Sequence, residues 1–250
     1  MSETEAGLAM LKRPAGVDLA YRLREGTSPT LVFLPGYASD MDGAKVLALD
    51  TFAADRGFAM LRFDYSGTGA SGGRFEDGTL SGWLDEARTM IDALTEGPLI
   101  LIGSSMGGWI ALHLALQMPD RVQALVGIAT APDFTDWGFT AEDKARLLAD
   151  NRLERQSAHG ADPQLTTRGF WESGQAMRLL GGPIAIDCPV RLIHGEADED
   201  VPVDIAMPLM ARLRSADVQL NILKGGGHRL SEPREIQVTV RTVAALMELD

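Results

Sequence analysis

The sequence predicts an α/β fold in which a mostly parallel, doubly wound sheet is covered by helices. Short apolar runs at residues 31–34, 58–63, 99–102 and 122–128 alternate with longer segments whose apolar residues recur at helical spacing. Strands without a polar face are typical of a parallel sheet that is buried on both sides. The length allows one large domain or two small ones and is ample for a buried core, and we expect residues 1–250 to form a single domain.

Turn and capping residues set the bounds of the other elements. Gly57, Gly97 and Pro119 each follow a segment of helical spacing, and residues of these types commonly end helices. Thr79 precedes the second of these segments, where a threonine side chain can cap a helix. The remaining expected elements are an antiparallel strand pair at 7–13 and 17–24 around Pro14-Ala15-Gly16, helices at 44–55, 80–94, 107–118, 202–213 and 235–248, and strands at 189–193 and 218–223.

The alternation of strands and helices is interrupted after Pro132. Residues 133–187 contain only helix-like pieces, at 142–156 and 169–180, before a buried strand resumes at 189–193. An insertion of this size between two strands of one sheet is more often a cover over a site than an independent domain. We therefore expect a small helical lid at about residues 133–187.

Five aromatic side chains of this insert are candidates for contact with a substrate. They are Phe134, Trp137, Phe139, Phe170 and Trp171. An apolar lid over an acyl group accounts for them, since ligand pockets are lined largely by apolar and aromatic side chains. Packing of a small insert against the body of the protein accounts for them equally well.

Composition excludes several classes of function. With 23 Lys and Arg against 35 Asp and Glu, the net charge is −12, which disfavours binding to nucleic acid or to an anionic membrane surface. Cys188 is the sole cysteine, so no internal disulfide can form, and four histidines leave little for a zinc site. Because neither a targeting segment nor a long apolar run is visible, we expect a cytoplasmic protein without a membrane span.

The motif Gly103-Ser104-Ser105-Met106-Gly107 fits G-x-S-x-G and lies between a predicted strand and a predicted helix. In this context the serine occupies a tight, strained turn. The small residues beside it let the backbone pass while the hydroxyl points outward. A chance turn of glycines and serines is the alternative, but the position between strand and helix favours Ser105 as a nucleophile.

A nucleophilic serine needs a histidine base, which comes last along the chain in this type of site. His228 lies in Gly225-Gly226-Gly227-His228-Arg229, directly after the last predicted strand, at the edge of the sheet where open α/β folds bind ligands. His113 lies on a helix, His159 in a polar part of the insert and His194 at the end of a strand. We expect His228 to be the general base.

The acid that orients this histidine should follow the strand at residues 190–193. Four carboxylates crowd that loop, and composition alone does not select among them: Glu196, Asp198, Glu199 and Asp200. We expect Asp198 to be the acid, with Asp200 as the next candidate and the two glutamates as solvated loop charges. Its role would be to fix the tautomer of His228 and stabilise the imidazolium as it forms.

An oxyanion formed during acyl transfer needs two backbone N–H donors. In this type of site one comes from the residue after the nucleophile, here Met106, and the other from the loop after residues 31–34. That loop reads Pro35-Gly36-Tyr37-Ala38-Ser39, and we expect the main chain of Tyr37 to be the second donor. The phenol of Tyr37 either lines the pocket or packs, and the sequence leaves both open.

A second glycine motif suggests a different class of function. Gly67-Thr68-Gly69-Ala70-Ser71-Gly72 matches G-x-G-x-x-G after a predicted strand, as in dinucleotide-dependent oxidoreductases. The predicted helix does not open within the motif, however, because residues 73–78 intervene. The preceding strand is also not the first of the predicted core, where the phosphate-binding turn belongs. We keep the oxidoreductase as the alternative from a different class.

These motifs combine into a resemblance to a known family. Over its whole length the chain resembles an α/β-hydrolase-fold serine hydrolase. More specifically, it resembles the family of the mitochondrial palmitoyl-protein thioesterase that also cleaves mycophenolic acid acyl-glucuronide. The runs that carry the resemblance are Leu34-Pro-Gly-Tyr37, Arg62-Phe-Asp-Tyr-Ser-Gly67 with Ser71, Gly103-Ser-Ser-Met-Gly-Gly-Trp109, Gly127-Ile-Ala-Thr-Ala131, Cys188-Pro-Val-Arg-Leu-Ile-His-Gly195, Asp198 and Val201-Pro202.

The resemblance implies Ser105, Asp198 and His228 as a catalytic triad that cleaves a small-molecule ester or thioester without a metal or organic cofactor. Palmitoyl-protein (S-acyl) thioesterase and acyl-glucuronide esterase activities are alternatives within this chemistry. The start of the chain departs from the family because it is acidic rather than arginine-rich, which favours a bacterial cytoplasmic relative. The insert also contains few residues that match the family. Anionic substrates are disfavoured unless a local arginine compensates, the candidates being Arg74, Arg168, Arg178 and Arg229.

Overall fold

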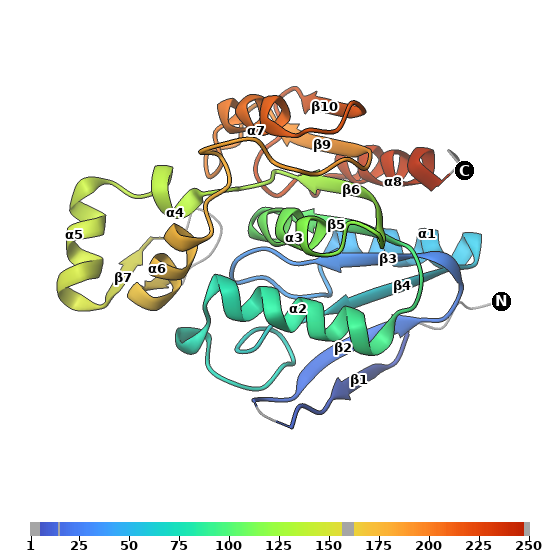
Figure 1. Cartoon of the computed structure of the whole chain (residues 1–250), viewed down its shortest axis with the longest axis horizontal. Helices are drawn as coiled ribbons and strands as arrows, with labels where there is room; N and C mark the ends of the chain where they lie inside the picture. Colours follow the sequence, from blue (N-terminus) through green and yellow to red (C-terminus); the bar gives the residue numbers. More distant parts are fainter. Residues whose placement is uncertain (1–5, 15, 157–162, 248–250) are drawn as a thin grey trace.

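The structure is a computed structural model that describes residues 6–14, 16–156 and 163–247. Its central feature is an eight-stranded sheet (Figure 1). Its strands are β1 (Leu8–Leu11), β2 (Leu19–Arg24), β3 (Thr27–Leu34), β4 (Phe58–Phe63), β5 (Leu99–Ser104), β6 (Val122–Ile128), β9 (Val190–Gly195) and β10 (Val218–Leu223). They lie side by side in the order β1-β2-β4-β3-β5-β6-β9-β10. Every pair from β4 to β10 is parallel, whereas β1 and β2 pair antiparallel at one edge, so the predicted fold class is confirmed.

Helices cover both faces of this sheet. They are α1 (Ala44–Arg56) and α8 (Pro233–Met247) on one face, and α2 (Leu80–Leu94), α3 (Met106–Gln117) and α7 (Ala206–Arg212) on the other (Figure 1). In β3, Leu31 and Phe33 pack into the core on the α1 side, and Val32 and Leu34 into the core on the α3 side. Successive side chains of a strand point to opposite faces, so a strand between two helical layers must be apolar at every position.

The expected helix at residues 202–213 is shorter in the structure. A 3-10 turn at Val203–Ile205 precedes α7, which ends at Arg212. Pro208 lies in the first turn of α7, where a backbone N–H has no acceptor within the helix, so the N–H that proline lacks costs no hydrogen bond. The proline therefore fits a helix that begins at Ala206.

The segment between β6 and β9 stands beyond the carboxyl ends of these strands (left in Figure 1). We call residues 133–187 the insert. It contains α4 (Phe134–Trp137), α5 (Ala141–Asp150), α6 (Arg168–Ala176) and an antiparallel pair of strands, β7 (Arg152–Arg155) and β8 (Gln164–Thr167), which we call the insert hairpin. His159 lies between these strands, outside the described residues.

Two sequence-based expectations for the insert are wrong in detail. The helix predicted at residues 142–156 ends at Asp150, because Asn151 takes a left-handed conformation with φ of 61° and closes it. Residues 152–155 then form a strand. The helix predicted at residues 169–180 spans Arg168–Ala176, and the side chain of Thr167 caps it by accepting from the Phe170 amide at 3.2 Å.

Candidate active site

Ser105 occupies the sharp turn between β5 and α3. Its backbone has φ of 54° and ψ of −118°, a strained conformation for a residue with a side chain. A Cβ on Gly107 would lie 2.0 Å from the Leu34 carbonyl oxygen, and one on Gly103 would lie 2.4 Å from the Gly107 carbonyl oxygen. Both motif glycines are thus required by the close approach of β3, β5 and α3, and the turn can form only with glycine at positions 103 and 107.

His228 lies between Ser105 and Asp198. Its Nε2 atom is 3.1 Å from the Oγ of Ser105, and its Nδ1 atom is 2.9 Å from the Oδ2 of Asp198. Because a carboxylate only accepts hydrogen bonds, Nδ1 carries the proton and Nε2 is left to accept from the serine hydroxyl. The three residues come from the ends of three different strands and meet at the carboxyl edge of the sheet.

The carboxylate of Asp198 is fully enclosed by the loop after β9. Its Oδ1 accepts from the amides of Asp200 at 3.0 Å and Val201 at 2.8 Å. Burial works to raise the pKa of Asp198, but the hydrogen bonds from His228 and the Val201 amide outweigh it, so the pKa lies below its ordinary value. Asp198 is therefore an ionised, fixed partner for the histidine.

His194 supports this loop from the end of β9. Its Nε2 atom is 2.9 Å from the carbonyl oxygen of Val201 and 3.5 Å from the Oδ2 of Asp198. Glu196 is exposed and accepts from the Gly225 amide at 3.1 Å. Ligand atoms of Asp198, Asp200 and His228 lie within 4.8 Å of one another, as in a metal site. Both ring nitrogens of His228 already have protein partners, however, which leaves this group poorly suited to a metal.

The loop at residues 35–39 lies directly against the nucleophile turn. A Cβ on Gly36 would lie 3.3 Å from the Ser104 carbonyl oxygen and 3.4 Å from the Cβ of Ser105. Tyr37 follows Gly36, and Met106 opens α3 on the other side of the serine. The two expected donors thus belong to segments that flank the serine.

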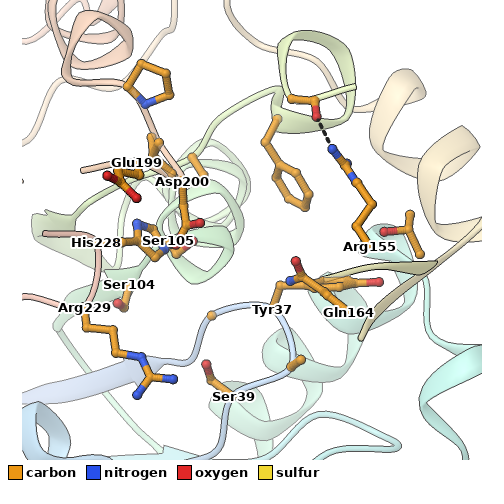
Figure 2. Close-up of a pocket in the computed structure, with 18 of the residues that line it drawn as sticks. Tyr37, Ser39, Ser104, Ser105, Arg155, Gln164, Glu199, Asp200, His228 and Arg229 are labelled. Atoms are coloured by element: carbon orange, nitrogen blue, oxygen red, sulfur yellow. Dashed lines mark hydrogen bonds between the residues drawn. The ribbon is translucent and has the colours of Figure 1, made fainter. Parts of the chain in front are cut away.

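A cavity of about 720 Å³ opens above Ser105 and His228. Ser105 and His228 lie on one side of it, and Arg155 and Gln164 of the insert lie across from them (Figure 2). Of the aromatic residues expected to contact substrate, the lining of this cavity includes Phe134, Trp137 and Phe139.

The other two aromatic residues of the insert, Phe170 and Trp171, do not line this cavity. The ring of Phe170 is buried between those of Tyr37, at 4.6 Å, and Trp83, at 5.5 Å. The indole of Trp171 donates to the Thr135 carbonyl oxygen at 2.8 Å. These two side chains hold the insert to the body and to itself, which is the packing role that the sequence left open.

Two charged residues at the cavity, Lys45 and Arg155, were missed by sequence reasoning, whereas Glu199, Asp200 and Arg229 were considered. Lys45 lines it from the start of α1 and donates to the carbonyl oxygen of Arg229. Burial, with the charge of Arg229, lowers the pKa of Lys45 to about 8, although Glu235 acts in the opposite direction. Arg155 donates to the Gly138 carbonyl oxygen at 2.9 Å, and its guanidinium lies 4.1 Å from the centre of the Phe139 ring.

The position of Lys45 just after the loop at residues 35–39 was an available signal, whereas Arg155 belongs to a hairpin that was not predicted. Of the four arginines considered from the sequence, Arg229 lines the cavity. Arg74, Arg168 and Arg178 form ion pairs with acidic residues.

The second glycine motif is explained by contacts within its own loop. Gly67 and Gly69 have φ of 75° and 48°, and a Cβ on Gly69 would lie 2.0 Å from the carboxylate of Asp64. That carboxylate accepts from the amides of Met41 and Ala70, each at 2.8 Å. The helix α2 begins only at Leu80, so the motif does not open a helix as a dinucleotide-binding turn does.

Comparison with known proteins agrees with this fold. The family model described as alpha/beta hydrolase fold matches residues 29–167. The human protein named palmitoyl-protein thioesterase ABHD10, mitochondrial, is 37% identical over 98% of this chain and 81% of its own length. Mouse alpha/beta hydrolase domain-containing protein 10 superposes with a TM-score of 0.91 at 35% identity, covering 97% of this chain and 99% of its own. A putative hydrolase from Agrobacterium vitis S4 gives the same TM-score at 38% identity over 98% and 99% of the two chains.

The expected cytoplasmic location is contradicted by these comparisons, because relatives that match nearly the whole chain are named as mitochondrial. A low cysteine count excludes an internal disulfide but does not distinguish one reducing compartment from another. Among the helices of the described residues, none combines the length and the apolar character that a transmembrane helix requires. Fold, family match and relatives together identify the chain as a member of the alpha/beta hydrolase family and a hydrolase of the ester and thioester type.

Proposed function

We propose that the protein is a serine hydrolase that cleaves carboxylic esters or thioesters through Ser105, His228 and Asp198. One observation carries the proposal: the continuous series of contacts from Asp198 Oδ2 to His228 Nδ1 at 2.9 Å and from His228 Nε2 to Ser105 Oγ at 3.1 Å. A serine hydroxyl is a weak nucleophile by itself, and an adjacent oriented base is what activates it.

The reaction proceeds in two acyl transfers, first to Ser105 and then to water. Ser105 Oγ attacks the acyl carbon while His228 Nε2 takes its proton, and the ionised Asp198 stabilises the resulting imidazolium. The N–H groups of Tyr37 and Met106 donate to the oxyanion. His228 then returns the proton to the leaving alcohol or thiol, and an acyl-enzyme remains. Water, deprotonated by His228, attacks this acyl group and releases the acid and the free serine.

The insert is the part of the molecule that we propose as a lid, with the whole chain as one domain. Phe134, Trp137 and Phe139 would contact the acyl group, since they are large apolar side chains in the cavity lining. Relatives named palmitoyl-protein thioesterase favour a thioester substrate, namely an S-acylated protein. An acyl-glucuronide esterase is the other substrate class within the same chemistry. Both would pass through the same acyl-enzyme.

A matched substrate series tests the reaction and its preference. We expect p-nitrophenyl esters from acetate to palmitate to be hydrolysed by the wild type, with activity lost by several orders of magnitude in Ser105→Ala. The same acyl groups presented as thioesters, with release of the thiol measured, give the ratio of thioester to ester activity. A fluorophosphonate should label Ser105 alone. Equal, slow rates for wild type and Ser105→Ala on every ester and thioester would contradict the proposal.

A further inference from the structure

Tyr37 is joined to two parts of the molecule that meet at the site. Its main chain belongs to the loop at residues 35–39, next to Ser105. Its hydroxyl donates to the carbonyl oxygen of Leu165, in strand β8 of the insert hairpin, at 2.6 Å. These two residues are 128 positions apart in the sequence. One side chain therefore connects the loop beside the nucleophile to the hairpin across the cavity (Figure 2).

The ring of Tyr37 strengthens this connection. Its centre lies 4.6 Å from the ring centre of Phe170 and 6.1 Å from that of Phe134, both in the insert. In the body of the protein, the ring centres of Phe75 and Trp83 lie 5.1 Å and 5.9 Å away. Three of these four contacts are edge-on, an arrangement that aromatic pairs favour. Burial raises the pKa of the Tyr37 phenol, only partly offset by a hydrogen bond with Thr166, so the hydroxyl keeps its proton and remains a donor.

The start of the loop is packed against the nucleophile turn through Gly36, and the residues on either side of Tyr37 have unusual backbone properties. Gly36 precedes Tyr37 and has wide conformational freedom, while Ala38 follows with φ of 53°, a conformation that alanine rarely adopts. Within the loop, the Ser39 amide donates to the Gly36 carbonyl oxygen at 3.2 Å. An oxyanion donor must be held within about 0.5 Å of its productive position. The anchored side chain of Tyr37 adds to this restraint at the residue that follows Gly36.

We propose that Tyr37 is a positioning residue whose side chain, held by Leu165 and the surrounding rings, fixes its own backbone N–H as an oxyanion donor when the insert hairpin is docked. The role rests on the proposed function, since it requires acyl transfer at Ser105. It makes the rate of the chemical step depend on the insert even for substrates too short to reach the insert. An insert that acted only as a cover would affect long acyl groups alone.

The substitution Tyr37→Phe tests this role because it keeps the ring and removes only the hydroxyl. We would measure kcat and KM for p-nitrophenyl acetate and p-nitrophenyl octanoate, and inhibition by a trifluoromethyl ketone, which forms a tetrahedral adduct bearing an oxyanion. We expect kcat to fall about tenfold on both esters, and the affinity for the ketone to fall by a similar factor. Melting temperatures of both proteins distinguish a loss of fold from a loss of rate.

Ser173→Ala is the matched control. The Oγ of Ser173, in α6, accepts from the Ser81 amide at 2.9 Å, which is another hydrogen bond between insert and body but does not involve the loop at residues 35–39. We expect this variant to hydrolyse the acetate ester as the wild type does. A tenfold loss here as well would show that any loosened contact of the insert slows the reaction, and would overturn the specific role of Tyr37.

Two other results would overturn the inference in distinguishable ways. If Tyr37→Phe raised KM for the octanoate alone and left acetate turnover and ketone affinity unchanged, the hydroxyl would only fasten the hairpin over the acyl group. If the wild type hydrolysed no ester or thioester and Ser105 did not react with a fluorophosphonate, the proposed function would fail, and the role of Tyr37 with it.

Discussion

The carboxylate of Asp133, at the start of the insert, accepts a hydrogen bond at 2.7 Å from the amide of Leu179, near its end. The other carboxylate oxygen accepts one at 2.8 Å from the amide of Leu180. Asp133 is buried and has φ of 58°, a region that aspartate and asparagine adopt more readily than most residues. Its backbone and its carboxylate both suit it to join the two ends of the insert.

Replacing Asp133 should therefore destabilise the protein. Asp133→Ala leaves the amides of Leu179 and Leu180, two half-buried residues, without an acceptor and places alanine at positive φ. We expect the free energy of unfolding in urea to fall by about 3 kcal/mol. Asp133→Asn keeps one acceptor and the favourable backbone, so a loss of about 1 kcal/mol is expected. Asp136→Asn, at an exposed ion pair with Lys144 and Arg178, should change stability by less than about 0.5 kcal/mol.

Asp198→Asn tests which carboxylate orients the histidine. An asparagine amide presented to His228 favours the wrong tautomer, and we expect kcat on p-nitrophenyl acetate to fall on the order of 10³- to 10⁴-fold. The protein should remain folded, because the side-chain oxygen still accepts from the Val201 amide. Glu196→Gln in the same loop should retain wild-type kcat. A large loss in Glu196→Gln with little change in Asp198→Asn would reverse the assignment.

The buried strands could be predicted from the sequence because residues on both of their faces are apolar, as Leu31, Val32 and Phe33 illustrate. The insert hairpin could not be. Residues 152–155 and 164–167 are short and largely polar, and they become strands only by pairing with each other across residues outside the described part. Helix propensity predicts that the preceding helix continues through Asn151. In the structure, this single left-handed residue ends the helix.

The residues of the site also divide into those that the sequence could predict and those that it could not. Ser105 and His228 stand in local patterns that report the shape of the backbone, a strand-to-helix turn and a glycine-rich loop after a strand, so the sequence could place them. Composition alone could not select among the four carboxylates that follow residues 190–193; Asp198 was the expected acid, and the resemblance implied the same residue. The contact between Tyr37 and Leu165 has no local signal, because the positions of both residues in space depend on the packing of the whole insert.

Lys45 should give the stability of the protein a specific dependence on pH. Its pKa is about 8 in the folded protein, against 10.5 for an unperturbed lysine. Between these values the unfolded chain binds a proton that the folded chain has released, so the contribution of Lys45 to stability rises with pH across this window. Allowing for screening by solvent at this partly exposed side chain, we expect a rise of about 1 kcal/mol.

The difference in unfolding free energy between wild type and Lys45→Met isolates this contribution from other groups that titrate there. Measured by urea denaturation from pH 7.5 to 10, the difference should shift in favour of the wild type as the pH rises. A difference that is flat over this range would show that the lysine has an ordinary pKa at the cavity.

Gly107→Ala tests how closely the nucleophile turn is packed. The added Cβ would lie 2.0 Å from the Leu34 carbonyl oxygen and 2.5 Å from that of Pro35, and neither backbone atom can move without shifting β3 or its following loop. We expect a loss of at least about 3 kcal/mol in unfolding free energy, with little remaining esterase activity. Gly181→Ala is the matched glycine control, because its Cβ would meet no atom within 4 Å and it should stay close to wild type. If Gly107→Ala were as stable and active as Gly181→Ala, the backbone of β3 would have to yield at this point, and the loop at residues 35–39 would not be held against Ser105 as the structure has it.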